Sequence, residues 1–81
     1  MTVDYRRTTL ELAPPGAQVR VVEVQHHSGQ ARRLMELGVV PGAVIRVVSN
    51  SAGPVVVEVG SARFAIGRGL ARRIIVEVVE Q

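Results

Sequence analysis

Short runs of valine-rich sequence, bordered by glycine and proline, constrain the fold of this chain more than any other feature. The clearest runs lie at residues 18–25, 43–49, 55–59 and 74–79. Valine is stiff about its first side-chain torsion and packs better on a strand than in a helix. Glycine and proline favour the turns that connect short strands. The pattern therefore predicts a small, mainly β domain.

The chain is long enough for one domain. It has 81 residues, of which 47% are hydrophobic, but only Tyr5 and Phe64 are aromatic. A domain of this size buries about 60–65% of its unfolded surface, so its core is thin and leaves little room for a deep active-site cleft. We expect residues 1–8 to form a flexible tail and residues 9–81 to form a single domain.

Five core strands are expected from the alternation of apolar and polar residues. Leu10 and Leu12 also alternate with polar neighbours, which is typical of a short strand or a packed arm. Five short antiparallel strands bury a core best by wrapping into a partly open barrel. The expected strands are Gln18–Gln25, Ala43–Ser49, Val55–Val59, Ala62–Ile66 and Ile74–Val79.

One short helix is predicted after the first of these strands. Ala31, Leu34, Met35 and Gly38 follow the spacing of a single helical face. Ser28 precedes the segment as an N-cap residue, and Gly38 stands where a left-handed C-terminal residue is favoured. A helical turn at residues 67–73 is expected before the last strand.

Several classes of protein are excluded by composition. The chain has no cysteine, so it has no disulfide framework and no thiolate zinc site. Its longest nearly apolar run, residues 37–45, is far shorter than the roughly 20 residues that span a bilayer. Residues 1–9 are polar and do not resemble a secretory signal. We therefore expect a soluble, cytoplasmic protein.

The basic residues do not indicate nucleic-acid binding. All ten of them are arginine, the formal net charge is +3, and seven acidic residues are interleaved with them. Nucleic-acid-binding proteins concentrate basic charge in a patch and often add stacking aromatic side chains. Neither feature is visible in this sequence, so no nucleic-acid partner is expected.

The segment RLMELGVVPG at residues 33–42 resembles the central motif of the FeoA family of ferrous-iron transport accessory proteins. The likeness extends over about residues 9–79, with Leu34, Leu37, Gly38, Pro41 and Gly42 as its structural motif. The resemblance implies an SH3-like barrel with an added helix. It also implies a non-catalytic cytosolic protein that docks on FeoB, the ferrous-iron permease, and modulates transport.

Two other functions remain open. A similar fold forms the C-terminal domain of iron-dependent repressors, so the chain could be a stand-alone regulatory domain that binds a transition metal or a peptide. A small RNA-binding barrel is the third interpretation. A steep salt dependence of RNA affinity would favour this last one.

The predicted partner-binding residues lie on the helix and directly after it. Arg32, Arg33 and Glu36 should face away from the buried side of the helix. Val39 and Val40 follow and are more apolar than a surface turn requires. An apolar centre with arginines at its rim is typical of a docking surface. The alternative is that Val39 or Val40 folds inward.

No catalytic residue and no cofactor are predicted. His26 and His27 are the only candidate metal ligands, and they are weak ones, because neighbouring residues on a strand point to opposite sides. Ser28 lies beside His27, but its expected task is to cap the helix. No glycine-rich segment has the spacing of a phosphate-binding loop. The chain is therefore predicted not to be an enzyme.

Overall fold

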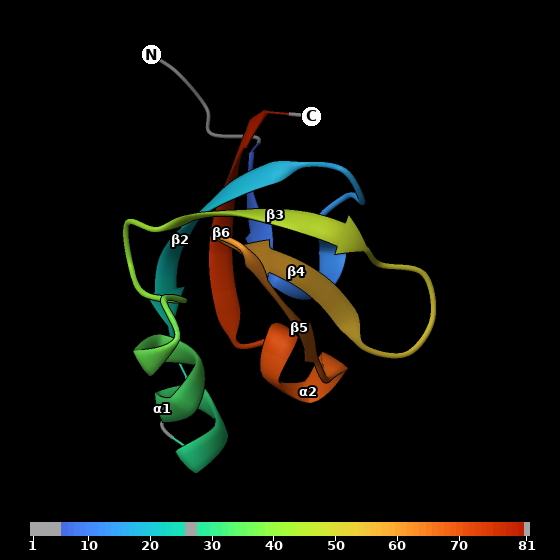
Figure 1. Cartoon of the computed structure of the whole chain (residues 1–81). Coiled ribbons are helices and arrows are strands. Elements are labelled where there is room, and N and C mark those ends of the chain that lie inside the picture. The colour runs from blue at the N-terminus through green and yellow to red at the C-terminus, as the bar shows by residue number, and fades with distance from the viewer. Residues whose placement is uncertain (1–5, 26–27, 81) are drawn as a thin grey trace.

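The computed structural model describes residues 6–25 and 28–80, whose strands curl around a common interior (Figure 1). This part of the chain contains six strands, two short α-helices and one 3-10 turn. In chain order, they are β1 (Arg7–Thr9), η1 (Leu10–Leu12), β2 (Gln18–Val24), α1 (Gly29–Glu36), β3 (Val44–Ser49), β4 (Val55–Val59), β5 (Ala62–Ile66), α2 (Arg68–Ala71) and β6 (Ile74–Glu80).

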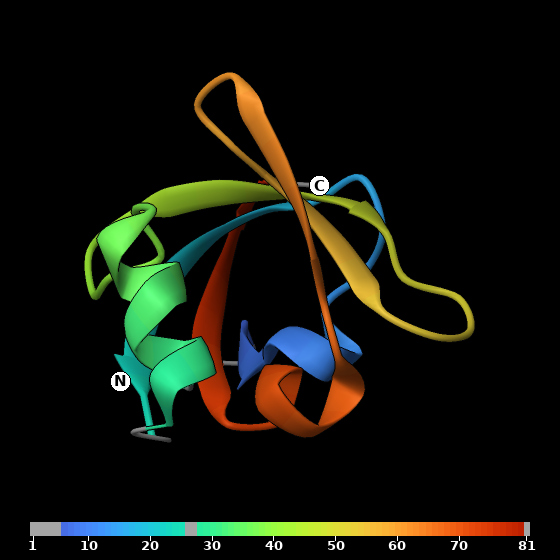
Figure 2. The same cartoon turned by 60° about the horizontal axis from the view of Figure 1, so that its bottom comes forward.

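The six strands form one antiparallel sheet in the order β1–β6–β2–β3–β4–β5. The sheet curls around the interior, and α1 and α2 lie at the same end of it (Figures 1 and 2). The order ends at β1 on one side and at β5 on the other, so these two strands are the edges. The mainly β fold is confirmed, with one strand more than the sequence predicted.

The extra strand lies at the predicted tail. Arg7–Thr9 pair with β6, so residues 7 and 8 belong to the sheet. Leu10–Leu12 form a 3-10 turn and not a strand. Leu10 is fully buried whereas Leu12 is 71% exposed, and residues i and i+2 of a strand would share one face. An alternation of only four residues is too short to separate a strand from a helical turn.

The predicted helix is confirmed as α1. The Oγ atom of Ser28 accepts a hydrogen bond of 3.1 Å from the backbone N–H of Ala31, as an N-cap does. Gly38 follows the helix with a φ of +113°, which side chains rarely adopt. A Cβ atom at Gly38 would also lie only 3.0 Å from Cγ1 of Val59. Conformation and space therefore both require glycine where the helix ends.

The helix packs on the sheet through a narrower stripe than the sequence predicted. Ala31 is fully buried, but Leu34 and Met35 are only half-buried. Leu34 touches the edge of the core, whose centre lies between the strands. The fully buried larger side chains come from η1, the strands and the segment after α1: Leu10, Ile45, Ile66, Ile74, Val19, Val21, Val39, Val47, Val55, Val57 and Val76.

Candidate functional site: a groove beside the sheet edge

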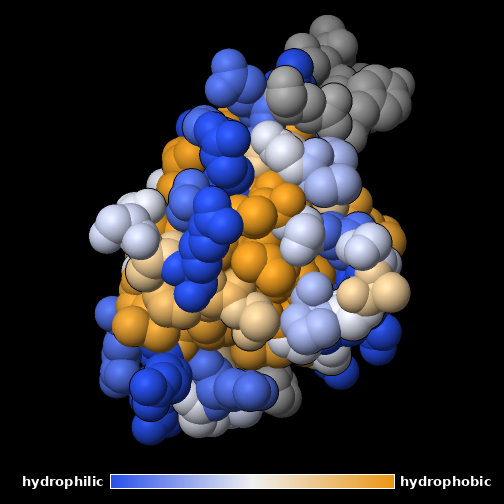
Figure 3. Space-filling view, turned by 45° about the vertical axis from the view of Figure 1, so that its right-hand side comes forward, coloured by the Kyte–Doolittle hydropathy of each residue, from blue (hydrophilic) through white to orange (hydrophobic). Residues whose placement is uncertain are grey.

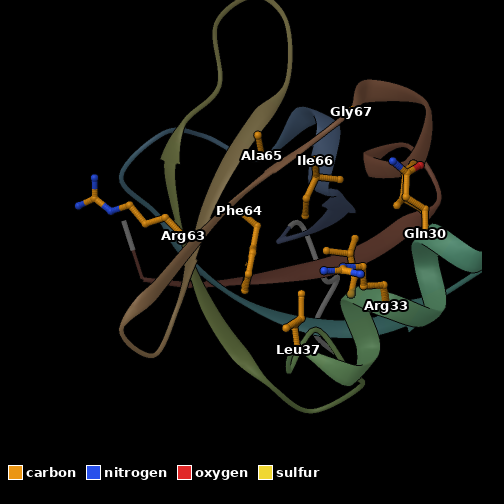
Figure 4. A pocket seen from close by; sticks show the side chains of 10 residues that line it. Gln30, Arg33, Leu37, Arg63, Phe64, Ala65, Ile66 and Gly67 are labelled. Carbon is orange, nitrogen blue, oxygen red and sulfur yellow. The ribbon is translucent and has the colours of Figure 1, made fainter.

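A groove of about 360 Å³ lies between α1, the edge strand β5 and α2 (Figure 4). Gln30, Arg33, Leu34 and Leu37 line it from the helix side. Residues 63–66 of β5 form the opposite wall, and Gly67 and Leu70 close one end. Its volume is near the lower end of the roughly 300–1,000 Å³ that is usual for ligand pockets.

The groove has an apolar floor and polar groups at its rim. Phe64 and Ile66 point from β5 toward the helix, whereas Arg63 extends away on the other side of the strand (Figure 4). Leu37 faces Phe64 from the end of α1. Arginine at the edge of an apolar surface is the usual composition of a protein interface. The groove can therefore hold apolar side chains and orient a charged group beside them.

Only one of the three predicted docking residues on α1 borders this groove. Arg32, Arg33 and Glu36 are all exposed, as expected. Only Arg33 lines the groove. Among the described residues, no ion pair joins Arg32 to Glu36, although they are four positions apart. Arg33 is thus the one charged residue of α1 that was predicted to dock a partner and that also lines the groove.

Val39 does not belong to the surface. It is fully buried, because the chain turns back under the helix and the N–H of Val39 donates a 2.9 Å hydrogen bond to the carbonyl of Leu34. The inward alternative therefore holds for this residue. Val40 is 37% exposed and Leu37 is 43% exposed. Leu37, which the sequence placed in the structural motif, lines the groove in place of Val39.

Hydrophobic side chains reach the surface outside the groove as well. Leu12 and Val44 are 71% and 48% exposed. Figure 3 shows one face on which apolar surface is crossed by long hydrophilic side chains. Leu12 and Val44 do not line the groove. They provide control positions for tests of the groove, where several apolar side chains converge.

Sequence reasoning missed the β5 and α2 sides of the groove. It predicted the strand Ala62–Ile66, but it could not tell that this strand is the edge of the sheet. Leu70 was assigned to a helical turn without a role. The detectable signal was Phe64, the one aromatic residue in a strand that otherwise consists of alanine, arginine and isoleucine. Large aromatic side chains dominate the energetics of interfaces.

A polar cluster fixes α2 at the end of the groove. The Nδ2 atom of Asn50 donates to the carbonyls of Glu11 and Ala13, at 2.9 and 2.7 Å. Arg68 donates from Nη2 to Oδ1 of Asn50 at 2.7 Å and to the carbonyl of Ser51 at 3.1 Å. The loop after β3 and the glycine-flanked Arg68 therefore hold each other in place, next to the Leu70 that borders the groove.

Glu11 and Arg72 complete this cluster with two parallel hydrogen bonds. Nε and Nη2 of Arg72 lie 3.2 and 3.1 Å from Oε1 and Oε2 of Glu11. The hydrogen bond to Arg72 lowers the pKa of the Glu11 carboxyl below its ordinary value, against the opposing effect of desolvation. Glu11 thus carries its charge to lower pH than a free glutamate does.

Many of the arginines are engaged within the fold. Glu77 pairs with Arg20 at 3.0 Å and with Arg7 at 3.8 Å, and Glu58 pairs with Arg63 at 3.2 Å. These pairs follow the strand register, in which Glu77 lies opposite both Arg7 and Arg20. Carboxylates thus break up the basic surface of the sheet.

The structure describes no metal centre. His26 and His27 lie outside the described residues. Among residues 6–25 and 28–80, no three histidine, cysteine, aspartate or glutamate side chains form a group that could hold a metal ion. The hydroxyl of Ser28 is used in capping α1. In the same ranges, no helix is long and apolar enough to cross a membrane.

Solved structures share this architecture. Stenotrophomonas maltophilia FeoA, described as an SH3 domain protein and solved in complex with zinc, is 36% identical, with a TM-score of 0.75 over 86% of this chain and 89% of its own. T. acidophilum IdeR is only 20% identical, with a TM-score of 0.79 over 96% of this chain and 37% of its own. The second likeness concerns the fold alone. The predicted SH3-like barrel is confirmed.

The sequence has a defined family. A Methanocaldococcus jannaschii protein provisionally named Fe(2+) transport protein A is 37% identical over 71 residues, which are 88% of this chain and 87% of the relative. Residues 8–78 match the FeoA domain. The match includes the helix and both walls of the groove. This chain belongs to the FeoA family.

Proposed function

We propose that this chain is a non-catalytic accessory protein of ferrous-iron uptake, and that it docks from the cytoplasm on an FeoB-type permease. Membership of the FeoA family supports the role in iron transport. The groove between α1 and β5 supports docking, and it is the observation on which this part of the proposal depends. It offers a contiguous apolar surface with an arginine at its rim, which is the composition of many protein interfaces.

Docking at this groove gives a direct way to influence transport. A protein without chemistry of its own changes a transporter by binding one conformation more tightly than another. Burial of Leu37 and Phe64 would supply most of the affinity, since apolar area removed from water contributes about 25 cal/mol per Å². The rim position of Arg33 favours association with an acidic surface and would act mainly on the rate of encounter.

Capture of the permease's cytosolic region by the purified chain tests this function. Leu37→Asp places a charge in the groove and should weaken capture by about tenfold or more. Val44→Asp is the matched control, because Val44 is similarly exposed but lies outside the groove. It should change capture by less than about threefold. Absence of capture by the unaltered chain would contradict the proposed function.

The regulatory-domain alternative makes a different prediction about metal. It rests only on the fold that this chain shares with T. acidophilum IdeR. For the proposed accessory role, calorimetry with anaerobic Fe(II), or with Zn(II) as a probe, should show no site tighter than about micromolar. A tight, stoichiometric site that is lost in the double variant His26→Ala/His27→Ala would reverse the ranking and favour metal sensing.

The nucleic-acid alternative is tested through salt. A protein that neutralises phosphates loses affinity with a log–log slope of about −0.7 to −0.9 per contact. We expect no submicromolar affinity for RNA or DNA at physiological salt. Such an affinity, lost in Arg32→Glu/Arg33→Glu without loss of the fold, would contradict the proposed role in protein docking.

A further inference from the structure

The backbone of β5 has hydrogen-bonding groups that the sheet does not use. Val59 and Ala62 flank the two-residue turn between β4 and β5, so they form the hydrogen-bonded pair that closes the hairpin. In an antiparallel ladder the bonded positions recur at every second residue. The N–H and C=O groups of Arg63 and Ala65 therefore point away from β4.

These unused groups face the groove. Residues 63–66 are four consecutive residues, and all of them line it. Successive side chains of a strand point to opposite faces, so four in a row can border one groove only where it meets the backbone at the strand edge. Within the described residues, no backbone hydrogen bond from another element reaches Arg63 or Ala65. The wall of the groove is thus an open template for another strand.

The side chains on β5 leave this edge accessible. The side chain of Arg63 lies on the other side of the strand, where its Nε atom donates a hydrogen bond of 3.2 Å to Oε2 of Glu58. Ala65 is too small to cover its own backbone. Proteins commonly protect an exposed edge with proline, a bulge or a covering element. β5 contains no proline, and its register with β4 is regular. The helix that could cover it, α1, lies on the opposite side of the groove.

Charge indicates what kind of segment fits. Arg33 and Arg63 are the charged residues among those that line the groove, and no carboxylate is among them. Arg33 has no ion-pair partner among the described residues. An occupant that carries an acidic side chain beside its apolar residues would complement Arg33. A second copy of this chain is disfavoured, because both copies carry a net charge of +3.

We propose that the groove binds one extended, apolar and acidic segment of the partner protein, which adds to the sheet as a strand beside β5. Its backbone bonds to the free groups of Arg63 and Ala65. Its alternate side chains enter the apolar floor formed by Phe64, Ile66 and Leu70, and an acidic side chain meets Arg33. This mode of recognition combines backbone hydrogen bonds for affinity with side-chain pockets for specificity. The inference rests on the proposed function, because the partner is the permease's cytosolic region.

Ala65→Pro tests the backbone contact. Proline removes the N–H that faces the groove but leaves the ladder with β4 intact, since the N–H of residue 65 does not bond to β4. Capture of the permease's cytosolic region should weaken by about tenfold, through one lost hydrogen bond and the bulk of the ring. Ala65→Val adds bulk at the same position but keeps the N–H, so it should weaken capture less than Ala65→Pro does, and equal losses would contradict the backbone contact. Circular dichroism checks that both variants fold.

A second pair of variants tests the charge. Arg33→Glu should weaken capture at least several-fold. Arg32→Glu makes the same charge change one residue away and outside the groove, so it should have an effect below about threefold. Hydrogen exchange supplies a readout that needs no variant. The amides of Arg63 and Ala65 should exchange rapidly in the free chain and become protected in the complex.

Each contrary outcome has a separate meaning. If the permease region is captured but Ala65→Pro has no effect and both amides stay unprotected, the strand-addition proposal is wrong while the proposed function stands. If the free chain forms dimers that Ala65→Pro abolishes, the occupant is a second copy. If the unaltered chain captures nothing, the proposed function fails, and the occupant named here fails with it.

Discussion

The two helices lie at the same end of the barrel but are attached to it in different ways. α2 has only four residues, yet Leu70 and Ala71 are buried and Arg68 is bonded to the loop after β3. α1 has eight residues, of which only Ala31 is fully buried. The shorter helix is therefore held by packing and a polar cluster, while the longer one borders an open groove. α2 is thus attached more tightly than α1, although residues of both segments line the groove.

This division has a physical basis. An apolar groove that stays open to water forgoes burial that would otherwise stabilise the fold. A domain of this size has only about 5–10 kcal/mol of net stability. It therefore cannot leave apolar core surface open to water beside both helices. The cluster around Asn50 fixes the α2 side without using apolar area. The α1 side can then remain less filled and available to a partner.

The largest expected effect compares one leucine from each helix. Leu70→Ala should destabilise the protein by roughly 2–4 kcal/mol, because Leu70 is only 8% exposed and its removal leaves a cavity. Leu34→Ala should cost about 1–2 kcal/mol, since Leu34 is half-buried and water already reaches part of its side chain. Denaturant titration of both variants measures the difference.

The reverse order of the two stability losses would contradict this comparison of the helices. The helical spacing alone, which puts Leu34 on the buried face of α1, predicts a cost of roughly 2–4 kcal/mol for Leu34→Ala. If Leu34→Ala proves more damaging than Leu70→Ala, α1 carries more of the stability than its burial indicates. The groove would then be part of a tightly packed core, and its use as a docking site would be disfavoured.

Most of the fold could be predicted because its signals are local. Alternation over residues 18–25 and 55–59 placed two strands, and Ser28 and Gly38 placed both ends of the helix. The N-terminal strand was missed because Arg7–Thr9 has no apolar alternation of its own. It forms a strand because β6 offers it a partner, with Thr8 opposite Val76. Pairing between distant segments is not visible in either segment alone.

The candidate site was harder to predict than the fold. Helical periodicity identified Arg33 as exposed, and in the structure it lines the groove. Periodicity could not decide whether Val39 or Leu37 reaches the surface, because the chain leaves the helix between them. The free edge of β5 depends on the order of strands in the sheet, which a single sequence does not encode locally. Half of the groove therefore required the tertiary structure.

A moderate effect is expected at the polar cluster that fixes α2. Asn50→Ala removes two hydrogen bonds to the carbonyls of Glu11 and Ala13 and leaves Arg68 without its nearest acceptor. Loss of such partners in a partly buried position should cost roughly 1–3 kcal/mol. Ser51→Ala is the control, since only its backbone carbonyl takes part, and it should stay within about 0.5 kcal/mol. Equal effects in thermal unfolding would show that the cluster does not fix α2.

The smallest expected effect is the pH dependence of the Glu11–Arg72 pair. Because Arg72 lowers the pKa of Glu11 in the folded state, the pair contributes stability that is fully present above the unfolded pKa, near 4.3. That contribution is lost as the pH falls through the folded pKa. The stability difference between the unaltered chain and Glu11→Gln should therefore be constant near neutral pH and shrink below about pH 4. Arg72 is largely exposed, so added salt should reduce the difference as well.

Glu36→Gln, which removes a carboxylate without an ion-pair partner in the described part of the chain, is the control for loss of charge. A Glu11→Gln difference that persists unchanged at pH 3 would mean that the side chain of residue 11 stabilises the α2 side through packing, and that the charge on Glu11 has no part in holding it.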